Sequence, residues 1–102
     1  MESVKEFFET LPSRVPPEKA AGMKNTYLFE IDKVGTWLVA VDDGKVAVTE
    51  GEGQADVRFK MSEQTLRKLV AGEQNPATAV LMRKIKVDGD MAAATKLGKL
   101  FG

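Results

Sequence analysis

The segment TYLFEIDKVGTWLVAVDDGKVAVTE, residues 26–50, decides the fold. Its apolar side chains recur at every second position, as at Tyr27 and Phe29, and that period of two is typical of half-buried β-strands. The pair Asp43-Gly44 supplies two neighbouring residues that tolerate a positive φ, which a tight type I′ hairpin requires. The segment therefore predicts three short strands joined by tight turns.

The prediction extends to both sides of this segment. A fourth strand with the same alternation is expected over residues 57–61, so that four strands form an antiparallel meander. Upstream, apolar residues at helical spacing predict a helix that ends at Pro12. They are Val4, Phe7, Phe8 and Leu11. A second, short helix is expected over residues 16–21.

The chain after residue 61 is expected to be mainly helical. Ser62 is a good N-cap for a helix that ends at Gly72, and an Asn-Pro pair at residue 75 favours the start of another. Strict alternation over residues 84–88 predicts a fifth strand, after which Asp90 caps a last helix over residues 91–101. We therefore expect one α+β domain over residues 1–102.

The composition excludes several classes of function. The 102 residues contain no His and no Cys, which removes imidazole bases, thiolate nucleophiles, His or Cys metal sites and disulfides. Fifteen Lys and Arg balance 15 Asp and Glu, so the chain lacks the basic surplus of a nucleic-acid-binding protein. We expect no metal, no cofactor and no nucleic-acid partner.

The first residues, MESVKEFFETLP, lack the basic and continuously apolar regions of a signal peptide. No apolar run approaches the ~18 residues that a transmembrane helix requires. We therefore expect a cytoplasmic location.

Acidic pairs are the remaining route to catalysis without His. Each stands in or beside a glycine turn, where acidic residues are common for backbone reasons, so we expect no enzyme activity. A Gly51-x-Gly53 pair is followed by a strand rather than by the helix that a phosphate loop needs. The acidic residues concerned are Asp42, Asp43, Glu50, Glu52, Asp88 and Asp90.

Two residue groups leave alternatives open. Basic residues near the C-terminal end either hold an anionic headgroup or, as is more common, form a solvated strand face and helix end. Methionine and aromatic residues are more often packed core than ligand pocket, although Met also lines pockets for varied apolar ligands. The basic residues are Arg83, Lys84, Lys86, Lys96 and Lys99.

Seven motifs follow one another in a recognisable order. They are Gly35-Thr36-Trp37-Leu38-Val39, Asp43-Gly44-Lys45-Val46, Ala55-Asp56-Val57, the Ser62 to Gly72 helix, Asn75-Pro76, the Lys84 to Asp90 strand with its turn, and Ala94 to Leu97. Over residues 8–101 this set resembles the sterol carrier protein type 2 family of lipid-transfer domains. Each motif alone is common, and the ordered set carries the resemblance.

The resemblance implies a five-stranded, mainly antiparallel sheet that about five helices cover on one face, with an apolar tunnel between the layers. It implies non-enzymatic binding and transfer of fatty acids, fatty acyl-CoA or sterol-like lipids. We predict that the side chains turned towards this tunnel are Phe29, Trp37, Val39, Phe59, Met82, Met91, Leu97 and Phe101. Arg83, where the family often has Gly, and Lys84 are the candidates for a headgroup contact.

The family's fold is often appended to enzymes, which provides an alternative. The chain would then be an accessory interaction module that serves a lipid-metabolising enzyme without carrying ligand itself. Besides the lipid, such an enzyme and a membrane surface are the partners we expect, each in transient contact.

Overall fold

Five strands form one mixed sheet, in the order β3-β2-β1-β4-β5. The strands are β1 (Lys24–Ile31), β2 (Gly35–Asp42), β3 (Lys45–Glu50), β4 (Val57–Met61) and β5 (Ile85–Gly89). The structure is a computed structural model that describes residues 3–101, without the side chains of Pro76 and of residues 97–101. Three strand pairs are antiparallel, and β1 runs parallel to β4.

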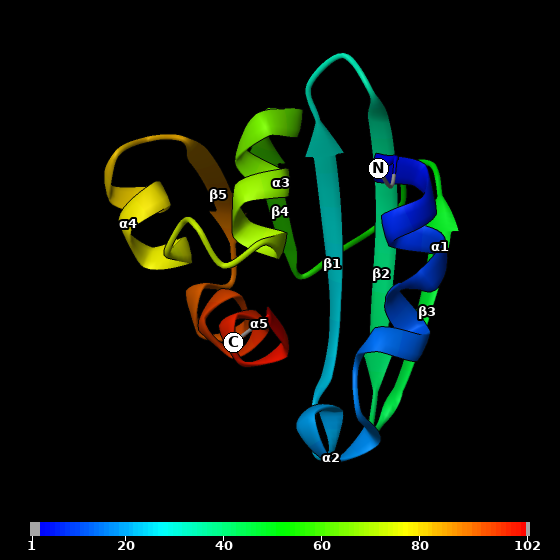
Figure 1. The fold of residues 1–102 in the computed structure, drawn as a ribbon. Coiled ribbons are helices and arrows are strands. Elements are labelled where there is room, and N and C mark those ends of the chain that lie inside the picture. Colours follow the sequence, from blue (N-terminus) through cyan, green and yellow to red (C-terminus); the bar gives the residue numbers. More distant parts are fainter. Residues whose placement is uncertain (1–2, 102) are drawn as a thin grey trace.

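The helices cover one face of this sheet, as predicted (Figure 1). They are α1 (Val4–Arg14), α2 (Pro17–Ala20), α3 (Glu63–Val70), α4 (Pro76–Leu81) and α5 (Met91–Phe101). Helix α1 lies over the β2–β3 side, α3, α4 and α5 lie over the β4–β5 side, and α2 lies at one end of the sheet (Figure 1). The α+β class and the five strands are therefore confirmed.

The predicted meander is wrong in its last step. Instead of pairing with β3, β4 lies beside β1, so residues 51–56 must cross the outer face of the sheet (Figure 1). The crossing segment is held to β1 because the Asp56 N–H donates to the Thr26 carbonyl (2.8 Å) and the Thr26 N–H donates to the Asp56 carboxylate (2.9 Å). It also packs against Leu38 at Gly53. Alternation identifies the faces of a strand, but it does not identify the strand's neighbours.

Local signals in the sequence place most element ends correctly. Asp43 and Gly44 have φ of 41° and 91°, which confirms the tight hairpin. The side chains of Ser62, Asn75 and Asp90 all accept hydrogen bonds from backbone N–H groups at the starts of α3, α4 and α5. These bonds satisfy donors that have no partner within the helix.

Pro12 does not end α1, which continues to Arg14. A proline removes one hydrogen bond to the residue four positions earlier and crowds that carbonyl. Because Pro12 lies in the last turn of α1, the loss is confined to the helix end, and the helix retains its buried face.

The core beneath α1 is densely aromatic. Phe8 is fully buried and stacks on Trp37 of β2, with ring centroids 4.8 Å apart and planes 11° apart. Its ring also lies 5.4 Å from that of Phe29. Stacked rings of this size fill the space between helix and sheet. In the described part of the chain, no helix is both long and apolar enough to span a bilayer.

Candidate functional site

An apolar cavity of about 470 Å³ lies between the sheet and helices α3, α4 and α5. Among its described lining residues, only Thr95 has a polar side chain, and its hydroxyl donates to the Met91 carbonyl (3.0 Å) within α5. The described lining residues are Phe29, Phe59, Met61, Leu66, Leu69, Ala77, Val80, Leu81, Ile85, Val87, Met91, Ala94 and Thr95. The described lining can therefore bind a ligand through complementary shape and apolar contact, but it provides little hydrogen bonding.

The floor of the cavity follows from strand register. Phe29 of β1 lies opposite Phe59 of β4, which in turn lies opposite Val87 of β5. The rings of Phe29 and Phe59 stack with centroids 5.3 Å apart. Since residues in register share a face of the sheet, one row of apolar side chains crosses three strands. The next row, Met61 and Ile85, extends this floor.

The roof of the cavity includes two small side chains. Ala77 of α4 and Ala94 of α5 both line the space. An alanine reaches only one carbon from the backbone, so it leaves room that a leucine or phenylalanine would fill. The helices themselves come close to the sheet because Ala79 and Ala93, 0% and 1% exposed, are small as well.

Tyr27 connects α5 to the sheet. Its buried hydroxyl donates to the Ala93 carbonyl at 2.8 Å. Burial, together with the nearby carboxylates of Asp56 and Asp90, raises the pKa of Tyr27 to about 12. The phenol is therefore neutral at physiological pH and remains a hydrogen-bond donor. This bond fixes the first turns of the helix that roofs the cavity.

The start of α5 is fixed a second time, through Gly89. This residue has φ 121°, and a Cβ there would collide with the Asp56 carbonyl. The same carbonyl accepts from the Asp90 N–H (2.9 Å). Close backbone approach thus determines the position at which α5 leaves the sheet.

Two of the acidic residues that are candidates for catalysis bind backbone N–H groups. Asp43 accepts from the Gly22 N–H (2.9 Å), and Asp90 caps α5. Within the described residues, no group of three His, Cys, Asp or Glu is placed to hold a metal ion. Neither carboxylate lines the apolar cavity.

The predicted tunnel residues divide between two places. Phe29, Phe59 and Met91 line the cavity. Trp37 and Val39 share the helix-covered face but are packed beneath α1, because β2 lies on the far side of β1 from β4. The structure does not bring these two residues to the cavity. Contact of Phe29, Phe59 and Met91 with a ligand remains a prediction.

The other predicted residues do not line the cavity, or their side chains lie outside the described residues. Met82 is 58% exposed at the C-terminal end of α4 and does not line the cavity. Arg83 and Lys84 are exposed in the α4–β5 connection, where the Lys84 ammonium lies 3.5 Å from the Gln74 side-chain oxygen. The side chains of Leu97 and Phe101 lie outside the described residues.

Sequence reasoning missed most of the cavity lining. The missed residues are Met61, Leu66, Leu69, Ala77, Val80, Leu81, Ile85, Val87 and Ala94. The faces of Met61, Leu66, Leu69, Ile85 and Val87 are readable from the alternation of residues 57–61 and 84–88 and from the apolar stripe of α3. The sequence contained no signal that these faces enclose empty space rather than packed core.

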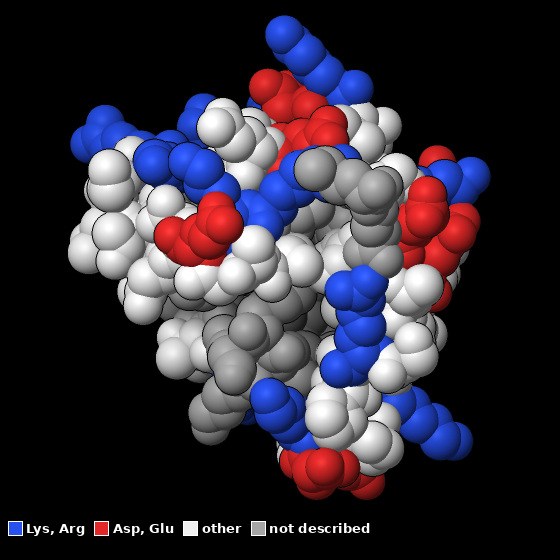
Figure 2. Space-filling view, in the orientation of Figure 1, with Lys and Arg blue, Asp and Glu red and all other residues white. Residues whose placement is uncertain are grey.

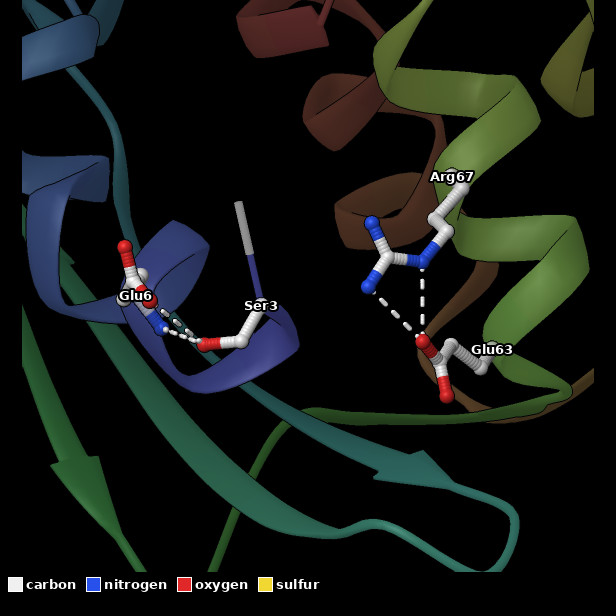
Figure 3. A network of polar contacts seen from close by, with 4 residues as sticks. All are labelled: Ser3, Glu6, Glu63 and Arg67. Atoms are coloured by element: carbon white, nitrogen blue, oxygen red, sulfur yellow. Dashed lines mark hydrogen bonds and ion pairs between the residues drawn. The ribbon is translucent and has the colours of Figure 1, made fainter. Parts of the chain in front are cut away.

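A second hollow, about 720 Å³, lies between α1 and α3. Val4 and Phe7 line one side, and Leu66 and Val70 line the other. Figure 3 shows two polar pairs beside it, one at the start of α1 and one on α3. The Ser3 hydroxyl interacts with Glu6, and Arg67 forms an ion pair with Glu63 at 2.8 Å.

This hollow between α1 and α3 has a rim of mixed charge. Glu63 and Glu73 oppose Arg67 and Lys68 among its lining residues. Such a rim favours neither an anionic nor a cationic ligand. The cavity below α4 and α5 is smaller but almost wholly apolar, and its chemistry therefore makes it the stronger candidate.

Comparison with known proteins agrees with this geometry. A family model described as the SCP-2 sterol transfer family matches residues 4–102. Hydroxysteroid dehydrogenase-like protein 2 of Xenopus tropicalis is 31% identical over 103 residues, which cover 97% of this chain and 25% of that protein. The chain thus spans about a quarter of the length of such curated relatives.

Two solved structures have similar folds. The sec-alkylsulfatase Pisa1 from Pseudomonas sp. matches with a TM-score of 0.85 and 27% identity, over 99% of this chain and 16% of its own. Palmitated SCP2L2 from Aedes aegypti matches with a TM-score of 0.78 and 20% identity, over 98% of this chain and 95% of its own. The first is a much longer protein, whereas the second is similar in length to this chain.

Proposed function

We propose that the chain, which belongs to the SCP-2 sterol transfer family, binds lipids in the cavity below α4 and α5 and transfers them unaltered. The single observation that carries this proposal is the apolar lining, in which the one described polar side chain is already hydrogen-bonded within its helix. The volume of about 470 Å³ lies within the ~300–1,000 Å³ range of small-molecule sites.

The energetics of such a site favour long apolar chains. Each methylene moved from water into the cavity contributes ~0.8 kcal/mol, which is roughly a fourfold gain in affinity. The described lining lacks converging polar groups. The apolar chain of the lipid, rather than its headgroup, therefore determines the affinity. We propose fatty acids, fatty acyl-CoA and sterol-like lipids as the ligand class. The palmitated relative with a similar fold is consistent with an acyl ligand.

We further propose that the domain is not an enzyme and uses no metal or cofactor. Burial raises the pKa of Tyr27 to about 12, so its phenol is not ionised near neutral pH and is not available as a base. Its hydroxyl is also engaged with the Ala93 carbonyl. The cytoplasmic location remains a prediction.

A second candidate is the accessory interaction module. It is favoured by the comparisons, since matching segments make up about a quarter of a protein named as dehydrogenase-like and 16% of an alkylsulfatase. In that case the partner would be a lipid-metabolising enzyme, and the cavity would be empty in use. The cavity itself favours ligand binding over this alternative.

The test is displacement of a fluorescent polyunsaturated fatty acid by unlabelled ligands of increasing chain length. Trp37 is a poor reporter because it is packed against Phe8 beneath α1, away from the cavity. We expect affinity to rise roughly fourfold per methylene until the cavity is filled, and then to level off. Native mass spectrometry of the purified protein should detect a co-purified lipid. A folded protein that binds no lipid at tens of micromolar would refute the proposal and favour the interaction module.

A further inference from the structure

Large apolar side chains are exposed where the cavity reaches the surface. Leu81 is 83% exposed and Met91 is 58% exposed, although both line the cavity. Met82, next to Leu81, is also 58% exposed. The described part of the chain has five exposed large hydrophobic residues, and these are three of them. A grouped apolar surface of this kind usually marks an interaction site.

Two basic side chains adjoin this apolar surface. Arg83 and Lys84 follow Met82 directly. No Asp or Glu occurs between residues 74 and 87. In the described part of the chain neither of these two cations forms an ion pair. Figure 2 shows basic side chains beside uncharged surface over α4 and the connection to β5.

We propose that Leu81–Lys84 and Met91, here called the α4–β5 tip, dock the protein onto an anionic phospholipid bilayer. The apolar side chains enter the interfacial region, the cations contact lipid phosphates and carboxylates, and the cavity opening faces the acyl chains. Apolar residues beside Lys and Arg are the combination that binds such interfaces. The proposal rests on the lipid-binding function for its purpose, because docking would let a lipid pass without crossing water.

The first experiment reverses the charge of the tip. Co-sedimentation is measured with vesicles of phosphatidylcholine containing about 30 mol % phosphatidylserine, and with pure phosphatidylcholine vesicles. The double variant Arg83→Glu/Lys84→Glu is compared with Lys33→Glu/Lys45→Glu, which changes the net charge equally. Lys33 is a good match for Arg83, since both are exposed turn residues with φ near 60° (64° and 61°).

The wild type and the control variant should bind the anionic vesicles, and high salt should weaken this binding. Each cation near an anionic surface strengthens binding roughly fivefold, so the tip variant should lose at least tenfold. Equal losses in both variants would show that net charge alone is responsible, and this result would overturn the proposal. Wild-type binding that is equally strong on neutral and anionic vesicles would also overturn the proposal. Absence of wild-type binding to both kinds of vesicle would overturn it too, and would favour a protein as the partner of the tip.

A second pair of variants tests the apolar part. Met82→Asp removes an exposed apolar side chain that does not line the cavity, and Val34→Asp does the same in the β1–β2 turn, where Val34 is 42% exposed. Only Met82→Asp should reduce vesicle binding, by at least tenfold. Equal vesicle binding by the two variants would overturn the proposal.

Ligand binding is measured separately, in vesicle-free solution, for all four variants. The fluorescent fatty acid should bind Met82→Asp, Val34→Asp and Lys33→Glu/Lys45→Glu as it binds the wild type, because none of these residues lines the cavity. Arg83→Glu/Lys84→Glu is measured with a fluorescent apolar ligand that has no carboxylate, because Arg83 and Lys84 are the candidates for a headgroup contact. Normal ligand binding without vesicle binding by the wild type would overturn the docking proposal and leave the lipid-binding function intact. Absence of ligand binding by the folded wild type would instead refute the function.

Discussion

Ala94→Phe should close part of the cavity while leaving the fold intact. Ala94 is half-buried on α5 and lines the cavity. A phenyl ring at this position would enter existing space rather than displace packed atoms, so the strain expected from overpacking a dense core is avoided. Thermal unfolding of the ligand-free variant should therefore resemble that of the wild type.

The expected effect on ligand binding is large. A benzene ring fills a cavity of ~150 Å³, which is roughly a third of the 470 Å³ available here. If a methylene takes about the ~30 Å³ that a water molecule has in the liquid, the ring excludes about five methylenes. At ~0.8 kcal/mol each, the upper limit of the loss is ~4 kcal/mol, or about a thousandfold in affinity. Because the cavity opens to the surface, the acyl chain of a bound lipid can shift outwards and keep part of its contacts. We therefore expect the affinity for the lipid to fall by at least tenfold.

The assay is the chain-length series described above, with Ala92→Phe as the matched control. Ala92 lies on the same helix but is exposed and does not line the cavity. In Ala94→Phe the rise of affinity with chain length should stop several methylenes earlier than in the wild type, whereas Ala92→Phe should follow the wild type. Identical series for the two variants would mean that lipids bind elsewhere, and the assignment of the cavity would have to be abandoned.

Three further predictions concern the attachment of α5. Tyr27→Phe removes the hydrogen bond to the Ala93 carbonyl and should cost about 1 kcal/mol in urea unfolding at pH 7; an unchanged midpoint would contradict the role of this bond. Since the pKa of Tyr27 is raised to about 12, the unfolded phenol ionises first, and stability should fall as pH rises from 10 to 12, by roughly 2–3 kcal/mol more in the wild type than in Tyr27→Phe; equal slopes would argue against the shift. Gly89→Ala, which meets the Asp56 carbonyl, should destabilise by at least ~1 kcal/mol more than Gly51→Ala, where φ is a similar 120° but the space is open; equal losses would show that backbone strain alone matters.

Features determined by neighbouring residues could be predicted from the sequence. The Asp43-Gly44 hairpin and the caps at Ser62, Asn75 and Asp90 depend on chemistry within four residues, and all four are present. The same is true of strand faces, because a two-residue period is fixed by backbone geometry. The end of α1 differs from the prediction because a proline in the last turn removes a single helical hydrogen bond. The two exposed residues that follow it, Ser13 and Arg14, both hydrogen-bond to Thr10 and continue the helix.

Features determined by distant residues could not be predicted. Nothing in the alternation of residues 57–61 shows that this strand pairs with β1 rather than β3, since either neighbour would bury the same face. The place of Trp37 and Val39 in the fold could not be predicted for the same reason. Excluding them from the cavity lining requires knowing that β1 separates β2 from the strands that form most of its floor.

The sheet supports two halves that differ in how completely they are filled. Beneath α1, Phe8 and Trp37 stack face to face and occupy the space between the layers. Beneath α4 and α5, alanines lie where larger side chains would close the gap, and Ala77 and Ala94 face an empty volume. An unfilled apolar cavity lowers stability, because its lining atoms lack contacts. The aromatic half and the Tyr27 bond to Ala93 supply contacts that offset this cost. The proposed function depends on the space that the side chains leave open and not on a reactive side chain. It is therefore compatible with a sequence that contains no His and no Cys.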